Sequence, residues 1–471
     1  MSIIVRRAVL LLVLAPCTAV GQDARAARVD SIFAAWQRDD APGCAVGVSG
    51  ADRLLFARGY GSANLDYRVP LEPTSVFYLA SVSKQFTAAA VALAARQGFL
   101  SLDDDVRRWL PELRLYEAPI TVRQLVHHTS GLRDYLTLMP LAGRRLQDVL
   151  SDADLIDLIA RQRALNFAPG TEFLYSNTGY VLLAEIVRRS TGKTLRAYAD
   201  EQIFRPLGMR DTHFHDDAGV VVPRRVIGYA RDSSGYRINH FFNFDKVGDG
   251  GLYSTVEDLA RWDRAMHQGT LGGSGFAAQL LDRGVLASGD TLPYAFGVIH
   301  DVYRGLRTVE HGGSLAGFRT ALIRFPDAGL SVIVLCNDGR ANTGLLARRV
   351  AEVHLGDRMG PSDETRRAAA PGRDTVASGG GAPDEPRPDL EPYAGTYFSE
   401  ELSTSYDLVI RDSVLVIVRP DRTLALRPAG HDTFVTTQGL RLRFSTDGAG
   451  RPVRFLVDAG RVRGVVFERT P

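Results

Sequence analysis

The chain has 471 residues, of which 45% are hydrophobic and 23% charged, and this is enough for a large buried core and an accessory module. Its formal net charge of +2 provides no strong field to attract nucleic acid or an anionic membrane surface. We therefore expect no nucleic-acid partner and no membrane recognition by charge.

The first 21 residues have the pattern of a secretory signal peptide. Arg6 and Arg7 precede an apolar run over 8–14, and small residues follow up to Gly21. We predict cleavage after Gly21 and a periplasmic or secreted location. The run is shorter than the roughly 20 apolar residues that a membrane-spanning helix needs. No later segment is long and apolar enough, so we expect no transmembrane anchor in the mature chain.

Two cysteines, Cys44 and Cys336, remain after removal of the signal peptide. Each lies in an apolar run typical of a buried strand, which favours two free thiols in a hydrophobic core. Two cysteines do not make a disulfide framework, although a bridge between them remains the alternative.

The part of the chain at 22–356 begins and ends with strands and is helical between them. Helical spacing over 25–38 is followed by alternating runs at 44–48 and 54–58, which predict a hairpin. Periodicity predicts further helices at 83–96, 122–128, 154–161, 180–189 and 195–203.

The strand pattern returns in the second half of this region. Ser254 and Glu257 form a capping-box pattern, which predicts a helix through residue 267. Strands are expected between 294 and 336, most clearly at 322–325 and 330–335, and a helix at 343–353 follows.

Residues 357–388 change in character and predict a flexible linker. They are rich in Pro, Gly, Ser and charged residues and include three consecutive glycines at 379–381. Residues 389–471 then predict a small all-β domain, a barrel or a sandwich. Its expected strands are at 406–410, 414–418, 424–426, 440–444 and 453–457.

The strongest chemical signal is the motif Ser81-Val-Ser-Lys84 at the start of the predicted helix 83–96. Residues three apart share one face of a helix, so the Lys84 amine can reach the Ser81 hydroxyl. A serine hydroxyl is a poor nucleophile until an adjacent base accepts its proton. The positive end of the helix dipole also favours a developing oxyanion there.

The composition adds weight to this lysine. Lysine occurs only at 84, 193 and 246, although Lys and Arg together number 56. An arginine side chain stays protonated at the pH values at which proteins work. A buried lysine can have a lowered pKa and then act as a base. Ser190 and Lys193 repeat the spacing, but they follow a predicted helix that Gly192 ends, so we do not expect a second site there.

Two further motifs lie far along the chain, at Tyr175-Ser-Asn177 and His311-Gly-Gly313. With Ser-x-x-Lys in this order, the sequence resembles the serine β-lactamase and penicillin-binding-protein superfamily, in its class C β-lactamase, D-aminopeptidase and esterase branch. The resemblance implies an α/β (α+β) transpeptidase-like fold, with an antiparallel sheet flanked by helices and an all-helical subdomain. The C-terminal domain resembles the small lipocalin-like β-domain of several such hydrolases.

The resemblance also implies roles for the motif residues. Ser81 would be the acylated nucleophile, and Lys84 would take its proton or hold Tyr175 in its ionised form. Tyr175 would relay the proton to the leaving group, and Asn177 would bind a substrate carbonyl. The backbone N–H groups of Ser81 and Ser314 would form the oxyanion hole. Gly312 and Gly313 would let substrate pair with the backbone of an edge strand.

His311 stands where β-lactam-hydrolysing relatives usually have a lysine. A histidine is largely neutral at pH 7, so we expect a weak preference for free carboxylates. The expected substrates are small amides, esters or short peptides with D-residues, without a metal or an organic cofactor. His127, His128, His213 and His215 are possible ligands by type, but no carboxylate or cysteine spacing completes a metal site.

Other interpretations stay open from the sequence. A β-lactamase or carboxylesterase could use the same residues, and a non-catalytic module could bind wall peptides or a partner protein. Residues 312–316 also approach the nucleophile elbow of α/β-hydrolases, with Ser314 as the nucleophile. An elbow opens a helix, however, whereas the residues after 316 are predicted as a strand. The sequence does not indicate an oligomeric state.

Overall fold

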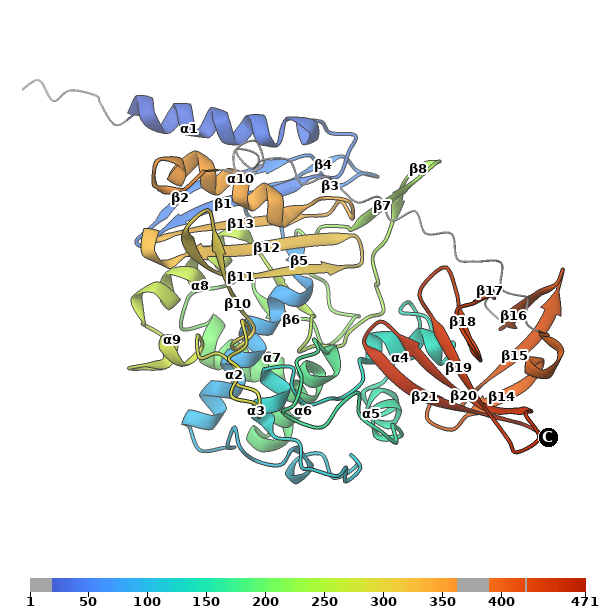
Figure 1. The fold of residues 1–471 in the computed structure, drawn as a ribbon. Helices are drawn as coiled ribbons and strands as arrows, with labels where there is room; N and C mark the ends of the chain where they lie inside the picture. The colour runs from blue at the N-terminus through green and yellow to red at the C-terminus, as the bar shows by residue number, and fades with distance from the viewer. Residues whose placement is uncertain (1–18, 362–388, 420–421) are drawn as a thin grey trace, which may run out of the picture.

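A six-stranded antiparallel sheet forms the centre of the first part of the chain (Figure 1). The computed structural model describes residues 19–361, 389–419 and 422–471. The predicted signal peptide and linker therefore lie mostly outside the described residues. The strand order is β10, β11, β12, β13, β1 and β2, with bounds Ile299–Tyr303, Leu306–Leu315, Phe318–Phe325, Leu330–Cys336, Cys44–Gly50 and Leu54–Tyr60.

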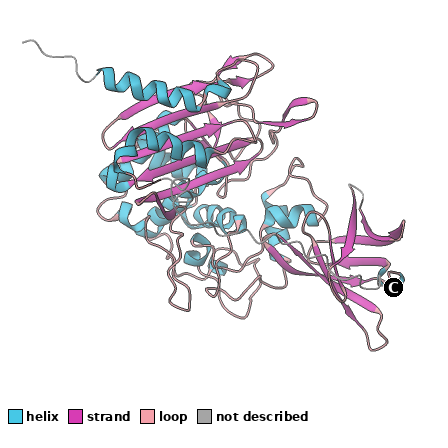
Figure 2. Ribbon diagram, turned by 45° about the horizontal axis from the view of Figure 1, so that its top comes forward, coloured by secondary structure: helices cyan, strands magenta, loops and turns pink. Residues whose placement is uncertain are grey.

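Helices cover both faces of this sheet, as expected, and Figure 2 shows the layers from a second side. The helices α1 (Ala19–Ile32) and α10 (Thr343–Leu355) pack on one face, where Val46 and Val48 point. The helix α8 (Val256–Gln268) packs on the other face. It approaches closely because residue 47 is glycine: a Cβ there would lie 2.4 Å from a methyl group of Val256. Both strands are buried along their whole length, which explains why most of the residues of β1 and β13 are apolar.

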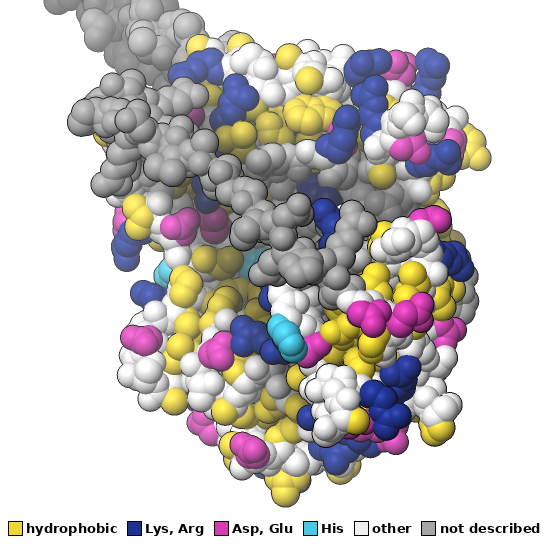
Figure 3. All heavy atoms as spheres, turned by 45° about the vertical axis from the view of Figure 1, so that its right-hand side comes forward, with side chains coloured by type: hydrophobic (Ala, Val, Ile, Leu, Met, Phe, Trp, Pro, Cys, Tyr) yellow, Lys and Arg dark blue, Asp and Glu magenta, His cyan; other side chains and the backbone are white. Residues whose placement is uncertain are grey.

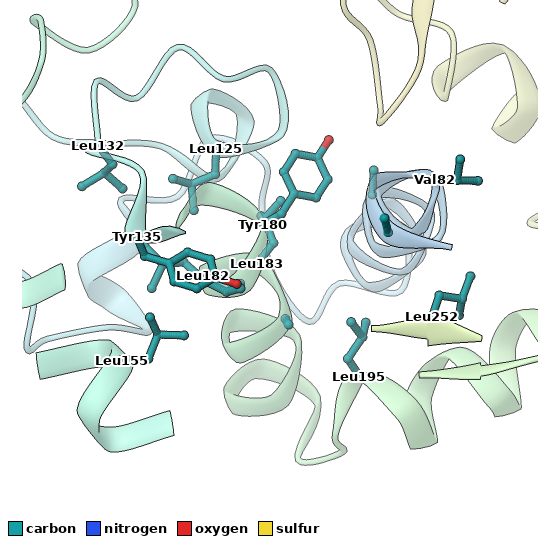
Figure 4. Packing of buried hydrophobic residues seen from close by; sticks show 14 of the residues in the cluster. Val82, Leu125, Leu132, Tyr135, Leu155, Tyr180, Leu182, Leu183, Leu195 and Leu252 are labelled. Carbon is teal, nitrogen blue, oxygen red and sulfur yellow. The ribbon is translucent and has the colours of Figure 1, made fainter. Parts of the chain in front are cut away.

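The middle of the chain forms a helical subdomain against the sheet. Its main helices α2 and α6 pack together, and Figure 4 shows Tyr180, Leu182 and Leu183 of α6 in the buried cluster. The bounds are Lys84–Arg96 (α2), Val122–Val126 (α3), Tyr135–Leu141 (α4), Asp152–Ala160 (α5), Asn177–Thr191 (α6), Leu195–Ala199 (α7) and Phe276–Gln279 (α9). Gly192 ends α6 with a φ of 74°, as the sequence predicts.

Two predicted helix boundaries are wrong for local reasons. The first helix ends at Ile32 rather than at 38; a 3₁₀ turn over Ala34–Trp36 follows it, and the Phe33 ring between them stacks on Tyr60 of the sheet. The cap of α8 is Thr255, whose side chain accepts a hydrogen bond from the Asp258 N–H. Ser254 ends a strand instead, and its hydroxyl lies 2.7 Å from that of Thr212.

Short sheets that the sequence did not predict lie outside the six-stranded sheet. The most important one joins β5 (Phe77–Tyr78), β9 (Leu252–Ser254) and β6 (His213–Phe214). Its strand β5 ends shortly before Ser81 in the chain. Two pairs complete the set, β3 (Ser62–Asn64) with β4 (Val69–Pro70) and β7 (Tyr229–Asp232) with β8 (Gly235–Ile238).

The C-terminal part is a closed barrel of eight strands, which decides between the predicted barrel and sandwich. Closure leaves no sheet edge, and the interior is filled by aromatic rings such as Tyr397, Phe444, Phe455 and Phe467. The strands are Gly395–Ser399 (β14), Thr404–Arg411 (β15), Val414–Val418 (β16), Thr423–Pro428 (β17), Thr433–Val435 (β18), Arg441–Thr446 (β19), Pro452–Ala459 (β20) and Val462–Arg469 (β21).

The surface agrees with the balanced composition. Basic and acidic side chains are interspersed over the face in Figure 3. None of the helices in the described ranges combines the length and apolarity needed to cross a membrane.

Cys44 and Cys336 form a disulfide, so the expectation of two free thiols is wrong. The two residues lie directly opposite each other on β1 and β13 and are fully buried. They are 292 residues apart in sequence, and only the pairing of the first with the last strand of this region brings them together.

We expect the double variant C44A/C336A to have a lower thermal midpoint than the oxidised protein. Loss of a native disulfide that closes a long loop typically costs about 2–5 kcal/mol. Scanning calorimetry with and without dithiothreitol measures the effect. The reductant should lower the midpoint of the wild type and leave the double variant unchanged; equal midpoints for the oxidised wild type and the variant would contradict the prediction.

Candidate active site

Ser81 and Lys84 lie together at the start of α2. A 3₁₀ turn over Ala80–Ser83 leads into the helix, and Lys84 Nζ is 3.2 Å from Ser81 Oγ. Ala80 has a φ of 48°, in the left-handed region that non-glycine residues rarely adopt. The Lys84 side chain is fully buried, whereas Ser81 is partly exposed, so the hydroxyl is accessible and its neighbouring amine is shielded from water.

The fold brings the second motif to the same place. Tyr175 precedes α6 and Asn177 begins it, and α6 packs against α2. Lys84 Nζ lies 4.9 Å from the centroid of the Tyr175 ring and 2.9 Å from Asn177 Oδ1. Ser81, Lys84, Tyr175 and Asn177 therefore form one cluster.

The Lys84 amine has three hydrogen-bond neighbours, and two of them can only accept. These are Asn177 Oδ1 and the backbone oxygen of Asp249, at 2.9 and 2.6 Å; the third is Ser81 Oγ. A neutral amine has two N–H bonds and one lone pair. When the two N–H bonds serve the two acceptors, the lone pair faces the Ser81 hydroxyl.

Burial favours this neutral form. It lowers the pKa of Lys84 to about 8, and the negative charges of Asp249 and Asp134 oppose part of the effect. Burial likewise raises the pKa of Asp249 to about 6. A substantial share of Lys84 is consequently neutral at mildly alkaline pH.

Asp134 fixes the orientation of Asn177. Its Oδ2 accepts hydrogen bonds from the backbone N–H of Asn177 at 2.6 Å and from the Asn177 side-chain amide at 2.9 Å. Because the NH₂ group is held by the carboxylate, the amide oxygen is turned toward Lys84. The same Oδ2 atom is 3.2 Å from Arg461 Nη1 of the barrel.

The Tyr175 hydroxyl is buried and has no hydrogen-bond partner among the described residues. Burial raises the pKa of this phenol. The His128 ring lies 4.3 Å from the Tyr175 ring, centroid to centroid, and holds it in place. The phenol is thus kept protonated beside the serine.

The third motif forms a partly free strand edge next to the site. The neighbouring strand β10 pairs only with Leu306–Glu310, so 311–315 of β11 pair on one side, with β12. Gly312 and Ser314 are exposed along this edge. A Cβ at Gly313 would lie 2.2 Å from Thr320 Oγ1 and 2.3 Å from the Leu79 oxygen, so glycine lets β11 approach the segment before Ser81.

His311 is buried and neutral. Burial and the nearby Lys84 charge lower its pKa to about 4. Its Nε2 lies 3.2 Å from the Tyr294 hydroxyl, and its Nδ1 lies 2.7 Å from the Gly312 oxygen. At pH 7 this residue therefore offers no positive charge to a substrate carboxylate.

The competing motifs have structural roles. The residues after Ser314 form a strand, β12, so 312–316 do not open a helix as a nucleophile elbow requires. Lys193 pairs with Glu201 on the surface. Within 19–361, 389–419 and 422–471, no three or more His, Cys, Asp or Glu side chains are arranged to hold a metal ion.

A family model described as Beta-lactamase matches residues 29–355, more than half of the chain. The chain belongs to the beta-lactamase family. The match covers the sheet and the helical subdomain, so all four clustered residues lie within it.

Relatives in this family include peptidases. Penicillin-binding protein 4* of Bacillus subtilis is 32% identical over 311 residues, covering 63% of this chain and 68% of that protein. A D-aminopeptidase of Cereibacter sphaeroides is 31% identical over 302 residues, and the match spans 63% of this chain and 57% of that enzyme's length. The chain is accordingly a serine hydrolase of the beta-lactamase family.

The fold comparison extends over the barrel. The octameric penicillin-binding protein homologue from Pyrococcus abyssi covers 96% of this chain and is itself covered completely, with a TM-score of 0.62 and 22% identity. This confirms the predicted fold, with its antiparallel sheet, flanking helices and small C-terminal β-domain.

Sequence reasoning missed several residues that shape the site. Asp134 and Asp249 lie outside the three motifs of the sequence. Tyr294 and Arg461 have no motif around them. Only the folded structure places them beside His311 and Asp134.

We expect the variants G313A and G312A to differ sharply. A methyl group at 313 meets Thr320 and the Leu79 backbone below 2.5 Å, whereas one at 312 makes an ordinary contact of 3.5 Å. Overpacking of this kind costs about 1–3 kcal/mol. G313A should lose thermal stability and kcat, and G312A should keep the wild-type midpoint. Equal midpoints for the two variants, measured by differential scanning fluorimetry, would contradict the close approach of β11.

Proposed function

We propose that this protein is an exported serine hydrolase that forms an acyl-enzyme on Ser81 and cleaves amide or ester bonds of small substrates such as D-amino-acid peptides. The observation that carries the proposal is the contact of a buried Lys84 amine with Ser81 Oγ at 3.2 Å. Two fixed acceptors take the N–H bonds of this amine, so its lone pair is directed to the nucleophile.

Acylation begins with proton transfer from Ser81 to Lys84. Neutral Lys84 accepts the hydroxyl proton while Ser81 Oγ forms a bond to the substrate carbonyl carbon, which gives a tetrahedral oxyanion. The backbone N–H groups of Ser81 and Ser314 stabilise the oxyanion. This assignment makes Lys84, rather than an ionised Tyr175, the base, since burial lowers the pKa of the amine and raises that of the phenol.

Tyr175 completes the step as the acid. Its protonated phenol donates to the leaving nitrogen or oxygen as the bond to the carbonyl carbon breaks, and the Lys84 ammonium then returns a proton to Tyr175. Water later attacks the acyl-enzyme by the same groups in reverse. Asn177 has a second role besides binding a substrate carbonyl. Its amide oxygen accepts a hydrogen bond from Lys84 Nζ and so positions the amine.

The substrate class follows from charge and from the strand edge. Neutral His311 provides no cation where a substrate carboxylate would otherwise be attracted, which disfavours β-lactam antibiotics. Gly312 and Ser314 are exposed on the free edge of β11, which favours a substrate with a peptide-like amide that pairs with this edge. The likeness to a D-aminopeptidase supports D-residues at the acyl position.

Export is supported by two independent features. The first 21 residues carry the charge and apolar pattern of a signal peptide. The buried disulfide between Cys44 and Cys336 suits an oxidising compartment. We propose a periplasmic or secreted location on this basis.

A substrate panel with matched variants tests the proposal. We expect the wild type to hydrolyse D-alanine p-nitroanilide faster than the L-isomer and faster than nitrocefin. A fluorophosphonate probe should label the peptide that contains Ser81 in both the wild type and S314A, and S81A should lose labelling and turnover. Label on Ser314, or turnover by S81A, would refute the assignment; a preference for simple esters over both amides would favour a carboxylesterase.

The pH dependence tests the base. Because Lys84 must be neutral to accept a proton, kcat/KM should be low in acid and rise through a pKa of about 8. Below that pH the slope should be about tenfold per pH unit, since only the unprotonated fraction is active. K84R keeps the charge but cannot supply the base, and should be inactive at every pH. An activity that is flat from pH 6 to 9 would contradict this role of Lys84.

A further inference from the structure

A hairpin of the barrel reaches the active site. The strands β20 and β21 are joined at Gly460 and Arg461, and in Figure 1 they lie on the side of the barrel that faces α4 and α5. The Arg461 guanidinium is 5.1 Å from the centroid of the Tyr175 ring. Its Nη1 is 3.2 Å from Asp134 Oδ2, the atom that also holds Asn177.

The hairpin is fixed to the catalytic part by buried contacts. Arg133 pairs with Glu401 of the barrel at 2.6 Å, and both side chains are at most 2% exposed. Arg133 also donates to the backbone oxygens of Arg463 and Gly464, at 3.0 and 2.9 Å. Since Asp134 follows Arg133 directly, the residue that anchors the barrel is bonded to the residue that orients Asn177.

Asp134 needs a counter-charge. Its side chain is 1% exposed, and a buried carboxylate without an opposite charge is strongly unfavourable. Asn177 provides two neutral donors, and Arg461 provides the cation. The guanidinium is 42% exposed, so water partly compensates its own burial.

We propose that Arg461 is a positioning residue of the active site: from the barrel it holds the Asp134 carboxylate, and through it the Asn177 amide that directs the Lys84 lone pair to Ser81. The inference rests on the proposed acylation of Ser81 with Lys84 as the base. It adds that the barrel contributes a residue, Arg461, on which the protonation state of Lys84 depends.

The charges around Lys84 give the direction of the effect. The titratable groups that face it come from every neighbouring element and are Asp134, Asp249, His128, Tyr175, Tyr180, His311 and Arg461. Asp134 and Asp249 raise the pKa of Lys84, and Arg461 lowers it. Loss of the Arg461 charge removes a repulsion from the ammonium and leaves Asp134 less compensated, and both changes favour protonated Lys84.

The test compares R461Q, R461K and R463Q in the full-length protein. In R461Q, the midpoint of the rise of kcat/KM with pH should move up by about one unit, so activity falls about tenfold at pH 7 and recovers at pH 10. R461K keeps the charge and should restore most of the wild-type midpoint. R463Q is the matched control, because Arg463 lies on the same hairpin but pairs with the exposed Glu172. It should leave the profile unchanged.

Three outcomes would overturn the inference. One is an unchanged midpoint in R461Q. Another is an equal shift in R463Q, which would indicate general loosening of the barrel. The third is a rise in KM confined to substrates with a free carboxylate, which would make Arg461 a substrate-binding residue. Thermal midpoints of all variants show whether any of them misfolds. If R461Q misfolds, the pH profile of R461K alone decides whether the inference holds.

Failure of the proposed function looks different. It would appear in the wild type, as a flat pH profile or as absence of probe on Ser81. Failure of the Arg461 inference leaves the wild-type profile and the label on Ser81 intact.

Discussion

The site depends on the removal of one amine from water without pairing it with a carboxylate. Lys84 is fully buried, and its two closest neighbours are an amide oxygen and a backbone oxygen. Such acceptors satisfy the N–H bonds but do not bind the proton as a carboxylate would. Desolvation therefore lowers the pKa of Lys84 toward a useful range, and Ser81 gains a base.

The surrounding structure maintains this condition from three sides. The contact of α2 with α6 brings Asn177 to the amine, and Asp134 keeps the amide oxygen pointing inward. Gly313 lets β11 lie against the segment before Ser81. The barrel anchors the backbone around Asp134 through Arg133. The contacts that orient Asn177 and those that dock the barrel therefore meet at two consecutive residues, Arg133 and Asp134.

Local patterns were predictable from the sequence, and contacts between distant segments were not. Ser81 and Lys84 are one helical turn apart, and the order of the three motifs indicated the family and its fold. The bond between Cys44 and Cys336 depends on which strands become neighbours, which alternation does not reveal. Arg461 lies in a turn that resembles any other barrel turn, and only the docking of the barrel brings it to Asp134.

The rarity of lysine in this arginine-rich chain is consistent with the same chemistry. The two other lysines pair with carboxylates: Lys193 with Glu201, and Lys246 with Asp152 and Asp245. Lys84 faces the backbone oxygen of Asp249, while the carboxylate of that residue accepts a hydrogen bond from Tyr135 at 3.1 Å. If this carboxylate turned to Lys84, the ion pair would hold the proton on the amine. In the structure Tyr135 binds this carboxylate, and Lys84 is hydrogen-bonded to Asp249 through the backbone oxygen.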